Sequence, residues 1–369
     1  MNKLLLGTAL VALSVAAAPA FAQDNASGVK LNVGGYFKGY ANYTNQDDSL
    51  STGEVRELDI VRDTEVHFGG ETTLDNGLTV GAQIEAKAQS GEDFIIDESY
   101  AYFSGTWGRI NFGDEDGAAY LLQVAAPSAD DNIDGIRAFI NPVNTDVATL
   151  ASLSTEVTNL LNIIDYDNDL ARGSDKVTYL TPVFSGFQAG ASYTPDLNGE
   201  SRRTSGNSLD NDGDEFGDVW EVAGRYEGQF NNVGLIAGAG YTHASLENET
   251  ASAVLEDDLN EWNVGLDLDI GAFGLGAIYT TSNLGLNDVD SDTYVVGADY
   301  TTGPFKVGAS YLNNDIEDSL ETDRYTGGVT YTYGPGMSFR GSVSYIDHQV
   351  DGGTDGDATS VLLGTQINF

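Results

Sequence analysis

The sequence predicts an all-β protein, a 16-stranded antiparallel transmembrane β-barrel whose long third loop folds inward and contains a short helix. Two patterns lead to this prediction: apolar and polar residues alternate along most of the chain, and tight turns alternate with long polar loops. The chain has no cysteine, so disulfides do not hold the fold, and a fully hydrogen-bonded barrel is one arrangement that would. The 45 glycines and only 7 prolines also suit a curved sheet. A sheet can span lipid only when it closes, because every backbone polar group there needs an internal partner.

The first 22 residues have the features of an export signal. Lys3 supplies a positive start, residues 4–18 form an apolar run, and Ala20 and Ala22 are small residues at the positions that a signal peptidase reads. The run is shorter than the about 20 apolar residues that a spanning helix needs. We therefore expect residues 1–22 to be removed and residues 23–369 to form the barrel.

Alternation of apolar and polar residues defines the first five strands. In residues 78–87, for example, Val80 and Ile84 share one face, whereas Gln83 and Glu85 share the other. The turns before and after this group are tight, at residues 75–77 and 106–108, and both contain glycine. The predicted strands cover residues 29–43, 64–74, 78–87, 98–105 and 109–113.

The same alternation continues after a long interruption and defines eleven more strands. The last one ends on Phe369, and its apolar face includes Leu363 and Ile367, whereas Leu362 is an exception on the polar face. A strand that ends on an aromatic residue suits a closed barrel in lipid. The predicted strands cover residues 174–184, 187–193, 218–230, 233–245, 260–270, 273–281, 293–301, 304–312, 324–333, 337–346 and 359–369.

The connections between strands predict the orientation of the barrel. Short turns at one end and long loops at the other are typical of outer-membrane barrels, in which the short turns are periplasmic. The alternative is a soluble β-sandwich, which would not place every long loop on one side of its sheet. The long loops are expected near residues 45–63, 90–97, 114–173, 195–217, 247–259, 283–292, 313–323 and 350–358.

The third of these loops, residues 114–173, is long enough to indicate a function. It follows the motif FGDEDGA at residues 112–118, continues with an apolar run at residues 118–126, and has apolar residues at helical spacing in residues 147–164. Apolar segments need a surface to pack on, so we expect the loop to fold against the inner wall or against a neighbouring subunit. Folding inward would place its carboxylates across the lumen.

These features together resemble the trimeric general porins of Gram-negative bacteria, and the motif at residues 112–118 is similar to that of the α-proteobacterial, Rhodobacter-type porins. The resemblance implies a homotrimer in the outer membrane, in contact with lipid and lipopolysaccharide, through which small hydrophilic solutes and ions diffuse passively. It also implies that acids on the third loop face bases on the barrel wall. The constriction acids carried over by the resemblance are Asp114, Glu115, Asp116, Asp130, Asp131 and Asp134.

Basic residues of the strands should point into the lumen, because a lipid-facing charge at the bilayer midplane costs roughly 2–4 kcal/mol. They would create a transverse field with the loop acids, or they would merely neutralise nearby carboxylates. Lys38 and Arg225 are the candidates for the narrowest part, since Arg109, Lys306 and Arg340 lie near strand ends. Eight basic residues share the polar face of their strands by parity: Lys38, Lys87, Arg109, Lys176, Arg225, Lys306, Arg324 and Arg340.

The formal net charge of −41 is concentrated in the predicted outer loops and excludes nucleic acid as a partner. A negative mouth concentrates cations, so we expect weak cation selectivity. Asp210, Asp212 and Asp214 follow the spacing of a calcium-binding loop, although Glu215 occupies the position where such loops have glycine. The sequence favours diffuse binding of Ca²⁺ or Mg²⁺ by the acidic loops over such a specific site, and no cofactor is required.

An enzyme is not expected from this sequence. The chain has only three histidines, His67, His243 and His348, and no Gly-x-Ser-x-Gly motif accompanies them. Two other functions stay open. One is a substrate-specific porin with a solute site at the long third loop, and the other is a surface or structural β-barrel that forms no channel.

Overall fold

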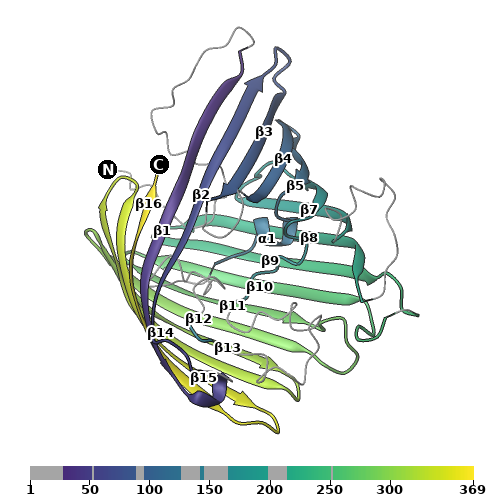
Figure 1. The fold of residues 1–369 in the computed structure, drawn as a ribbon. Coiled ribbons are helices and arrows are strands. Elements are labelled where there is room, and N and C mark those ends of the chain that lie inside the picture. Colours follow the sequence, from purple (N-terminus) through teal and green to yellow (C-terminus); the bar gives the residue numbers. More distant parts are fainter. Residues whose placement is uncertain are drawn as a thin grey trace.

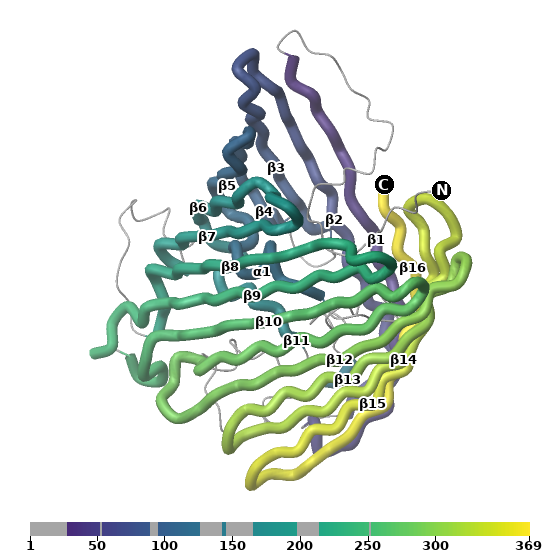
Figure 2. The backbone as a smooth tube through the Cα atoms, turned by 180° about the vertical axis from the view of Figure 1, so that it is seen from behind, coloured from purple at the N-terminus to yellow at the C-terminus, as the bar shows by residue number. Residues whose placement is uncertain are grey.

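The computed structural model describes residues 28–51, 54–88, 95–125, 142–144, 165–197, 214–250 and 252–369, and it has the predicted closed barrel of sixteen antiparallel strands (Figures 1 and 2). Each strand pairs with its neighbours in chain order, and β1 pairs with β16 to close the cylinder. The strands are β1 Lys30–Gln46, β2 Leu58–Thr73, β3 Thr79–Lys87, β4 Ile95–Gly105, β5 Gly108–Asp114, β6 Asp175–Leu180, β7 Phe187–Asp196, β8 Phe216–Phe230, β9 Val233–Leu246, β10 Leu259–Ile270, β11 Phe273–Ser282, β12 Ser291–Thr302, β13 Phe305–Ile316, β14 Leu320–Gly334, β15 Met337–Val350 and β16 Gly356–Asn368.

The outer face of the barrel is apolar and carries two rows of aromatic pairs. Aromatic rings gather at lipid–water boundaries, so two rows with aliphatic residues between them are the pattern of a membrane-spanning barrel. The row nearer the long loops contains the pairs Tyr193–Trp220, Trp262–Tyr279, Tyr294–Tyr311 and Tyr311–Tyr325. The row nearer the short turns contains the pairs Trp107–Tyr179, Phe187–Tyr226, Phe273–Tyr300 and Phe305–Tyr331.

The short turns lie where the sequence predicts them and use residues that tolerate positive φ. Gly271 has φ 70° between β10 and β11, and Gly303 has φ 57° between β12 and β13. Asn231, with φ 55°, serves the same purpose between β8 and β9. Tight turns of this kind fix the register of each hairpin, and therefore which side chains face the lumen.

Two predicted loops are shorter than expected: residues 350–358 are reduced to residues 351–355, and residues 313–323 are reduced to a tight turn. Residues 313–323 are not a long loop, because β13 continues to Ile316 and β14 begins at Leu320. The polar residues in this stretch are paired within the sheet, and the buried Asn314 amide donates to Ser291 Oγ and Thr293 Oγ1 at 3.1 and 2.8 Å. Polar side chains that pair with one another on the inner wall have the composition of a loop, so polarity alone does not distinguish a strand from a loop here.

The described part of the third loop turns into the barrel (Figures 1 and 2). A one-turn helix, α1 (Ala118–Leu121), forms within the apolar run and packs against β6, β7, β8 and β9. The helix predicted within residues 147–164 and the export signal at residues 1–22 lie outside the described residues. Among the described residues, no helix is both long and apolar enough to cross a bilayer.

Candidate functional site: the lumen wall and the third loop

The beginning of the third loop is fastened to the inner wall by main-chain groups. The ammonium group of Lys176 donates to the carbonyl oxygens of Glu115 and Ser174, the latter at 2.7 Å, and the amide of Ala118 donates to Ser192 Oγ at 2.5 Å. Lys176 lies in β6 and Ser192 in β7, so two neighbouring strands hold the loop as it leaves β5. This arrangement directs α1 into the lumen.

Gln123 joins the two ends of the loop to the wall. Its amide nitrogen donates to the carbonyl of Tyr166 at 3.1 Å, and its amide oxygen accepts from the backbone of Asn168 at 2.9 Å and from the side chain of Asn263 at 3.0 Å. Its own carbonyl accepts from Arg225 Nη1 at 2.8 Å. This one buried residue therefore connects the outgoing segment to the returning segment and to β10 through its side chain, and to β8 through its carbonyl group.

Glycines on the inner wall leave room for the loop. A methyl group at Gly265 would lie 2.7 Å from Val124 Cβ, and one at Gly238 would lie 2.9 Å from Val124 Cγ2. Gly238 and Gly265 are register partners on β9 and β10, so together they form a shallow recess beneath Val124. The loop can approach the wall here only because these two positions have no side chain.

Apolar side chains also point into the barrel and form a core inside it. Ile278, Val295 and Leu312 lie side by side on β11, β12 and β13, and each is at most 2 % exposed. Tyr166 of the returning loop belongs to the same buried cluster, as does Leu362, the apolar exception on the polar face of the last strand. This part of the wall supports the loop rather than facing open water.

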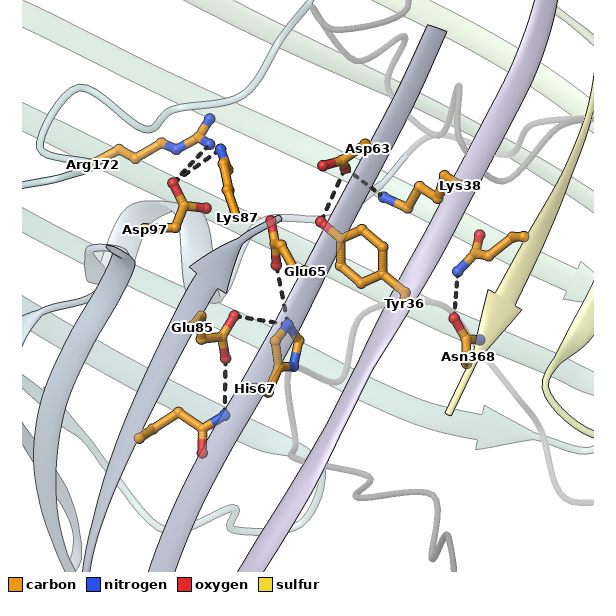
Figure 3. Close-up of polar contacts among 12 residues, drawn as sticks. Tyr36, Lys38, Asp63, Glu65, His67, Glu85, Lys87, Asp97, Arg172 and Asn368 are labelled. Carbon is orange, nitrogen blue, oxygen red and sulfur yellow. Dashed lines mark hydrogen bonds and ion pairs between the residues drawn. The ribbon is translucent and has the colours of Figure 1, made fainter. Parts of the chain in front are cut away.

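The wall formed by β1 to β4 is different, because its inward side chains are charged and partly exposed. Lys38 Nζ lies 3.6 Å from Asp63 Oδ2, which also accepts from the Tyr36 hydroxyl at 3.0 Å (Figure 3). Lys87 Nζ lies 2.9 Å from Asp97 Oδ1, and Arg172 of the returning loop reaches the same oxygen at 3.8 Å. Each of these wall lysines thus has a carboxylate beside it.

Three further titratable groups converge lower on the same wall. His67 Nε2 lies 3.0 Å from Glu65 Oε2 and 3.4 Å from Glu85 Oε2 (Figure 3). Glu65 and His67 are two residues apart on β2, so they share a face, and Glu85 is the register partner of His67 on β3. The Gln83 amide donates to the other oxygen of Glu85 at 3.1 Å.

The remaining predicted basic residues are held within the wall. Arg109 Nε donates to Asn111 Oδ1 at 2.6 Å and its guanidinium lies 4.1 Å from the centre of the Tyr102 ring. Arg225 is buried, with Glu227 at 3.7 Å, and Arg324 is fully buried and donates to Ser344 Oγ at 3.4 Å. Arg340 Nε donates to Ser338 Oγ at 2.9 Å. Lys306, likewise, lies 3.8 Å from Asp299.

The predicted constriction acids fall into two groups. Asp114 and Glu115 are buried between the loop and the wall, and Asp116 is half-buried. Burial raises the pKa of the Glu115 carboxyl to about 7, because the charged form loses water, although Arg109 opposes this shift. Asp130, Asp131 and Asp134 lie outside the described residues, so their place across the lumen stays a prediction.

The candidate calcium ligands are likewise divided. Asp210 and Asp212 lie outside the described residues. The Asp214 carboxylate accepts hydrogen bonds from the Ser252 hydroxyl at 2.6 Å and from the amide of Val254 at 2.7 Å. Those bonds lower the pKa of Asp214, with the Ser252 hydroxyl as the largest cause. In this structure Asp214 therefore anchors the loop between β9 and β10.

Sequence reasoning missed the recess and the wall acids. Nothing in the sequence pattern singles out Gly238 and Gly265 as contact positions, although both fall at inward positions on neighbouring strands opposite an apolar loop segment. Asp63 and Asp97 lie outside the predicted strands, at their loop ends, and so were not considered as partners for Lys38 and Lys87. Extending the alternation by a few residues would have placed Asp63 on the inner face.

An apolar exterior around a polar, partly filled interior defines the class of transmembrane β-barrel proteins. A family model described as Gram-negative porin matches residues 9–352, and the chain belongs to this family. Curated relatives include uncharacterized proteins of Rickettsia conorii and Rickettsia typhi, each 24 % identical over 400 residues. The two alignments cover 91 % and 94 % of this chain and 84 % and 86 % of the relatives, respectively.

Solved structures share the fold at low sequence identity. The anion-selective porin from Comamonas acidovorans has a TM-score of 0.62 and 16 % identity, with 92 % of this chain and 100 % of that chain covered. The trimer form of OmpT from Vibrio cholerae has a TM-score of 0.59 and 13 % identity over 93 % of this chain and all of that chain. A mutant of Rh. blastica porin has a TM-score of 0.56 and 15 % identity, covering 92 % of this chain and all of that one. These structures share the fold, and the match to the family model confirms the family expected from the sequence.

Proposed function

We propose that the protein is an outer-membrane porin whose water-filled channel lets small hydrophilic solutes and ions diffuse passively, with a weak preference for cations. The observation that carries this proposal is the inner wall of β1 to β4. Its side chains are polar, charged and partly exposed within a barrel whose outer face is apolar. A passage lined in this way admits water and polar solutes, and passive diffusion along it requires no catalytic group.

The preference for cations follows from the charges on that wall. Lys38 and Lys87 are matched by Asp63 and Asp97, and Glu65 and Glu85 add two carboxylates around one histidine. The wall is therefore not a basic surface. For Lys38 and Lys87 we favour the interpretation in which basic residues neutralise nearby carboxylates, rather than the one in which they create a transverse field. The Comamonas acidovorans porin has a similar fold and is anion-selective, so charge rather than fold would determine selectivity here.

Electrical recording from planar bilayers tests the proposal. Purified protein should insert in discrete current steps, and in a KCl gradient the reversal potential should have the sign of a K⁺-preferring channel. A series of neutral sugars of increasing size in liposome swelling would then give the size limit. A membrane that stays impermeable would overturn the proposal and favour the structural barrel, whereas saturation by one solute would favour a substrate-specific porin.

A homotrimer is part of the proposal, and the outer face of β2 supports it. Arg62 lies on this face, opposite to Asp63, on the same side as Ile60 and Phe68, which are 71 % and 43 % exposed. A charged side chain within a lipid-facing apolar band costs roughly 2–4 kcal/mol, so contact with another subunit is the better environment for Arg62. OmpT from Vibrio cholerae, a structural neighbour, has a trimer form.

The acidic outer loops are proposed to bind Ca²⁺ or Mg²⁺ and thereby to bridge loops, subunits or lipopolysaccharide phosphates. The net charge of −41 supports this idea, since divalent ions relieve repulsion among carboxylates. Chelator treatment should lower the melting temperature of the oligomer in detergent. Identical melting and conductance with and without the chelator would contradict it.

A further inference from the structure

We propose that Glu65, His67 and Glu85 form a binding site for a divalent transition-metal ion, with Zn²⁺ as the reference ion, on the lumen wall of β2 and β3. The three side chains are brought together by the sheet itself. Glu65 and His67 lie on one face of β2, and Glu85 is directly opposite His67 on β3. One ligand atom from each residue lies within 4.8 Å of the other two (Figure 3).

The spacing of these atoms fits a tetrahedral ion. Zinc bonds to imidazole nitrogen and carboxylate oxygen are about 2.0–2.2 Å long, so neighbouring ligand atoms in a tetrahedron lie about 3.3 Å apart. His67 Nε2 lies 3.0 Å from one Glu65 oxygen and 3.4 Å from one Glu85 oxygen. Only the two carboxylates need to approach each other, which rotation of two flexible glutamate side chains allows.

The surroundings orient the ligands as second-shell groups do in metal sites. Gln83 donates to the Glu85 oxygen that faces away from His67, which leaves the other oxygen directed at the imidazole. The Tyr36 ring meets the His67 ring edge-on, with ring centres 5.9 Å apart and an interplanar angle of 89°. Lys87, the nearby cation, has its ammonium group 2.9 Å from Asp97.

Charge and access favour an ion at this place. Two carboxylates facing one imidazole leave an excess of negative charge, which a divalent cation would neutralise. The side chains of His67, Glu85 and Glu65 are 28 %, 19 % and 9 % exposed, so an ion in the lumen can reach them and a water molecule can complete the coordination. Three protein ligands and one water form the usual open zinc site.

The donor set also selects the kind of ion. Mg²⁺ and Ca²⁺ prefer six or more oxygen ligands, whereas an imidazole with two carboxylates suits Zn²⁺ and its neighbours in the transition series. The site is therefore chemically distinct from the diffuse binding of Ca²⁺ or Mg²⁺ proposed for the outer loops. A bound ion would place two positive charges on the wall and would reduce the current carried by cations.

The experiment measures Zn²⁺ binding to the chelator-treated full-length protein in detergent by titration calorimetry with excess Mg²⁺ present. Wild type should bind one Zn²⁺ per chain, and His67→Ala should lose this site. His243→Ala is the matched control, because His243 is 32 % exposed and, among the described residues, has a single carboxylate within 4 Å, that of Asp258 at 3.9 Å. Gln83→Ala should weaken Zn²⁺ binding by roughly 10–100-fold, as loss of an outer-shell partner does.

Two further measurements keep the test decisive. Co²⁺ should give the intense visible absorption of tetrahedral coordination in wild type, and the nearly isosteric Glu85→Gln variant should lack it even if His67→Ala fails to fold. Zn²⁺ should lower the single-channel current of wild type reversibly. Equal Zn²⁺ binding by wild type and His67→Ala, or loss of the signal on adding Mg²⁺, would overturn the proposal. Binding is measured without channel activity, so the site and the proposed channel function can fail separately.

Discussion

The inner wall has two regions that differ in what their side chains do. On β1 to β4, Lys38, His67 and Lys87 are 20 %, 28 % and 24 % exposed and lie beside carboxylates. On β9 to β13 the wall presents Gly238 and Gly265 with a strip of buried aliphatic residues, and the third loop covers it. The strand geometry is common to both regions, so the size and polarity of inward side chains decide which part of the lumen is filled and which part stays wet.

The largest effect should come from filling the recess beneath the loop. In Gly265→Val, the new side chain would meet Val124 and Ile278 at distances shorter than van der Waals contact, so the loop must move away from the wall. Overpacking of this kind costs roughly 1–3 kcal/mol. We expect a lower melting temperature and a larger single-channel conductance.

The control for this change is Gly224→Val on β8. Gly224 faces outward, and a methyl group there would have only the Gln188 carbonyl, at 3.9 Å, within 4 Å. Its conductance should equal that of wild type. If Gly265→Val and Gly224→Val conduct equally, the covered wall does not limit the passage, and the contrast between the two regions has no functional meaning.

The barrel could be predicted from the sequence because its physical cause is local. A strand in lipid must alternate, so the faces of residues such as Val80, Ile84, Gln83 and Glu85 are evident from spacing alone. Tight turns such as that at Gly303 then fix the register. The incorrect loop at residues 313–323 lies where the inward side chains, such as Asn314 and Thr322, are polar but buried and paired within the wall, so their composition resembles that of a loop.

The site was less predictable because it depends on contacts between distant segments. Strand parity predicts that Lys38 and Lys87 lie on the inner face, but it contains no information on Asp97, which meets Lys87 through an irregularity in the β3–β4 pairing. The buried position of Glu115 depends on how the loop meets β6, which no spacing rule contains. Gly238 is important because it has no side chain in the way of Val124, and a single sequence gives little indication of such a role.

The second prediction concerns how firmly the loop is held at different pH values. The pKa of Glu115 is raised from 4.5 to about 7, so the folded protein binds this proton more tightly than the unfolded chain does. The resulting destabilisation is absent below about pH 4.5, grows as the pH rises towards 7, and is complete above pH 7. Glu115→Gln should therefore stabilise the protein by roughly 1–2 kcal/mol at pH 8 and have little effect at pH 4.

Melting curves of the purified protein at the two pH values measure this difference. Glu54→Gln is a suitable control, because Glu54 is an exposed residue of the loop between β1 and β2. Its melting temperature should change little, and equally, at both pH values. A Glu115→Gln variant that melts like wild type at pH 8 would show that the loop junction carries no buried charge.

The third prediction concerns the open wall. In Asp63→Asn, the amide oxygen can still accept from Tyr36, but Lys38 loses this negative charge. The wall becomes more positive, so the reversal potential in a KCl gradient should shift towards anion permeation, and more strongly at low salt, where screening over about 10 Å is weaker. Asp75→Asn, in the exposed turn between β2 and β3, removes an equal charge away from this wall and should shift the potential less.

The smallest effect is expected outside the barrel, where Asp214 anchors a loop that faces water. Its lowered pKa means that the anchor is complete above the ordinary pKa of an aspartate and is lost as the pH falls below it. Because Asp214 is only partly buried and solvent screens its carboxylate, Asp214→Ala should cost less than about 1 kcal/mol and should scarcely change the melting temperature. Hydrogen exchange at pH 7 should nevertheless quicken at the amides of Ala253, Val254 and Leu255, which donate to this carboxylate. Glu249→Ala, in the same loop, should leave those amides protected, and faster exchange in both variants would show that the anchor is not specific.

Ca²⁺ adds a further comparison: if it slows exchange in wild type but not in Asp214→Ala, Asp214 also takes part in the predicted calcium site.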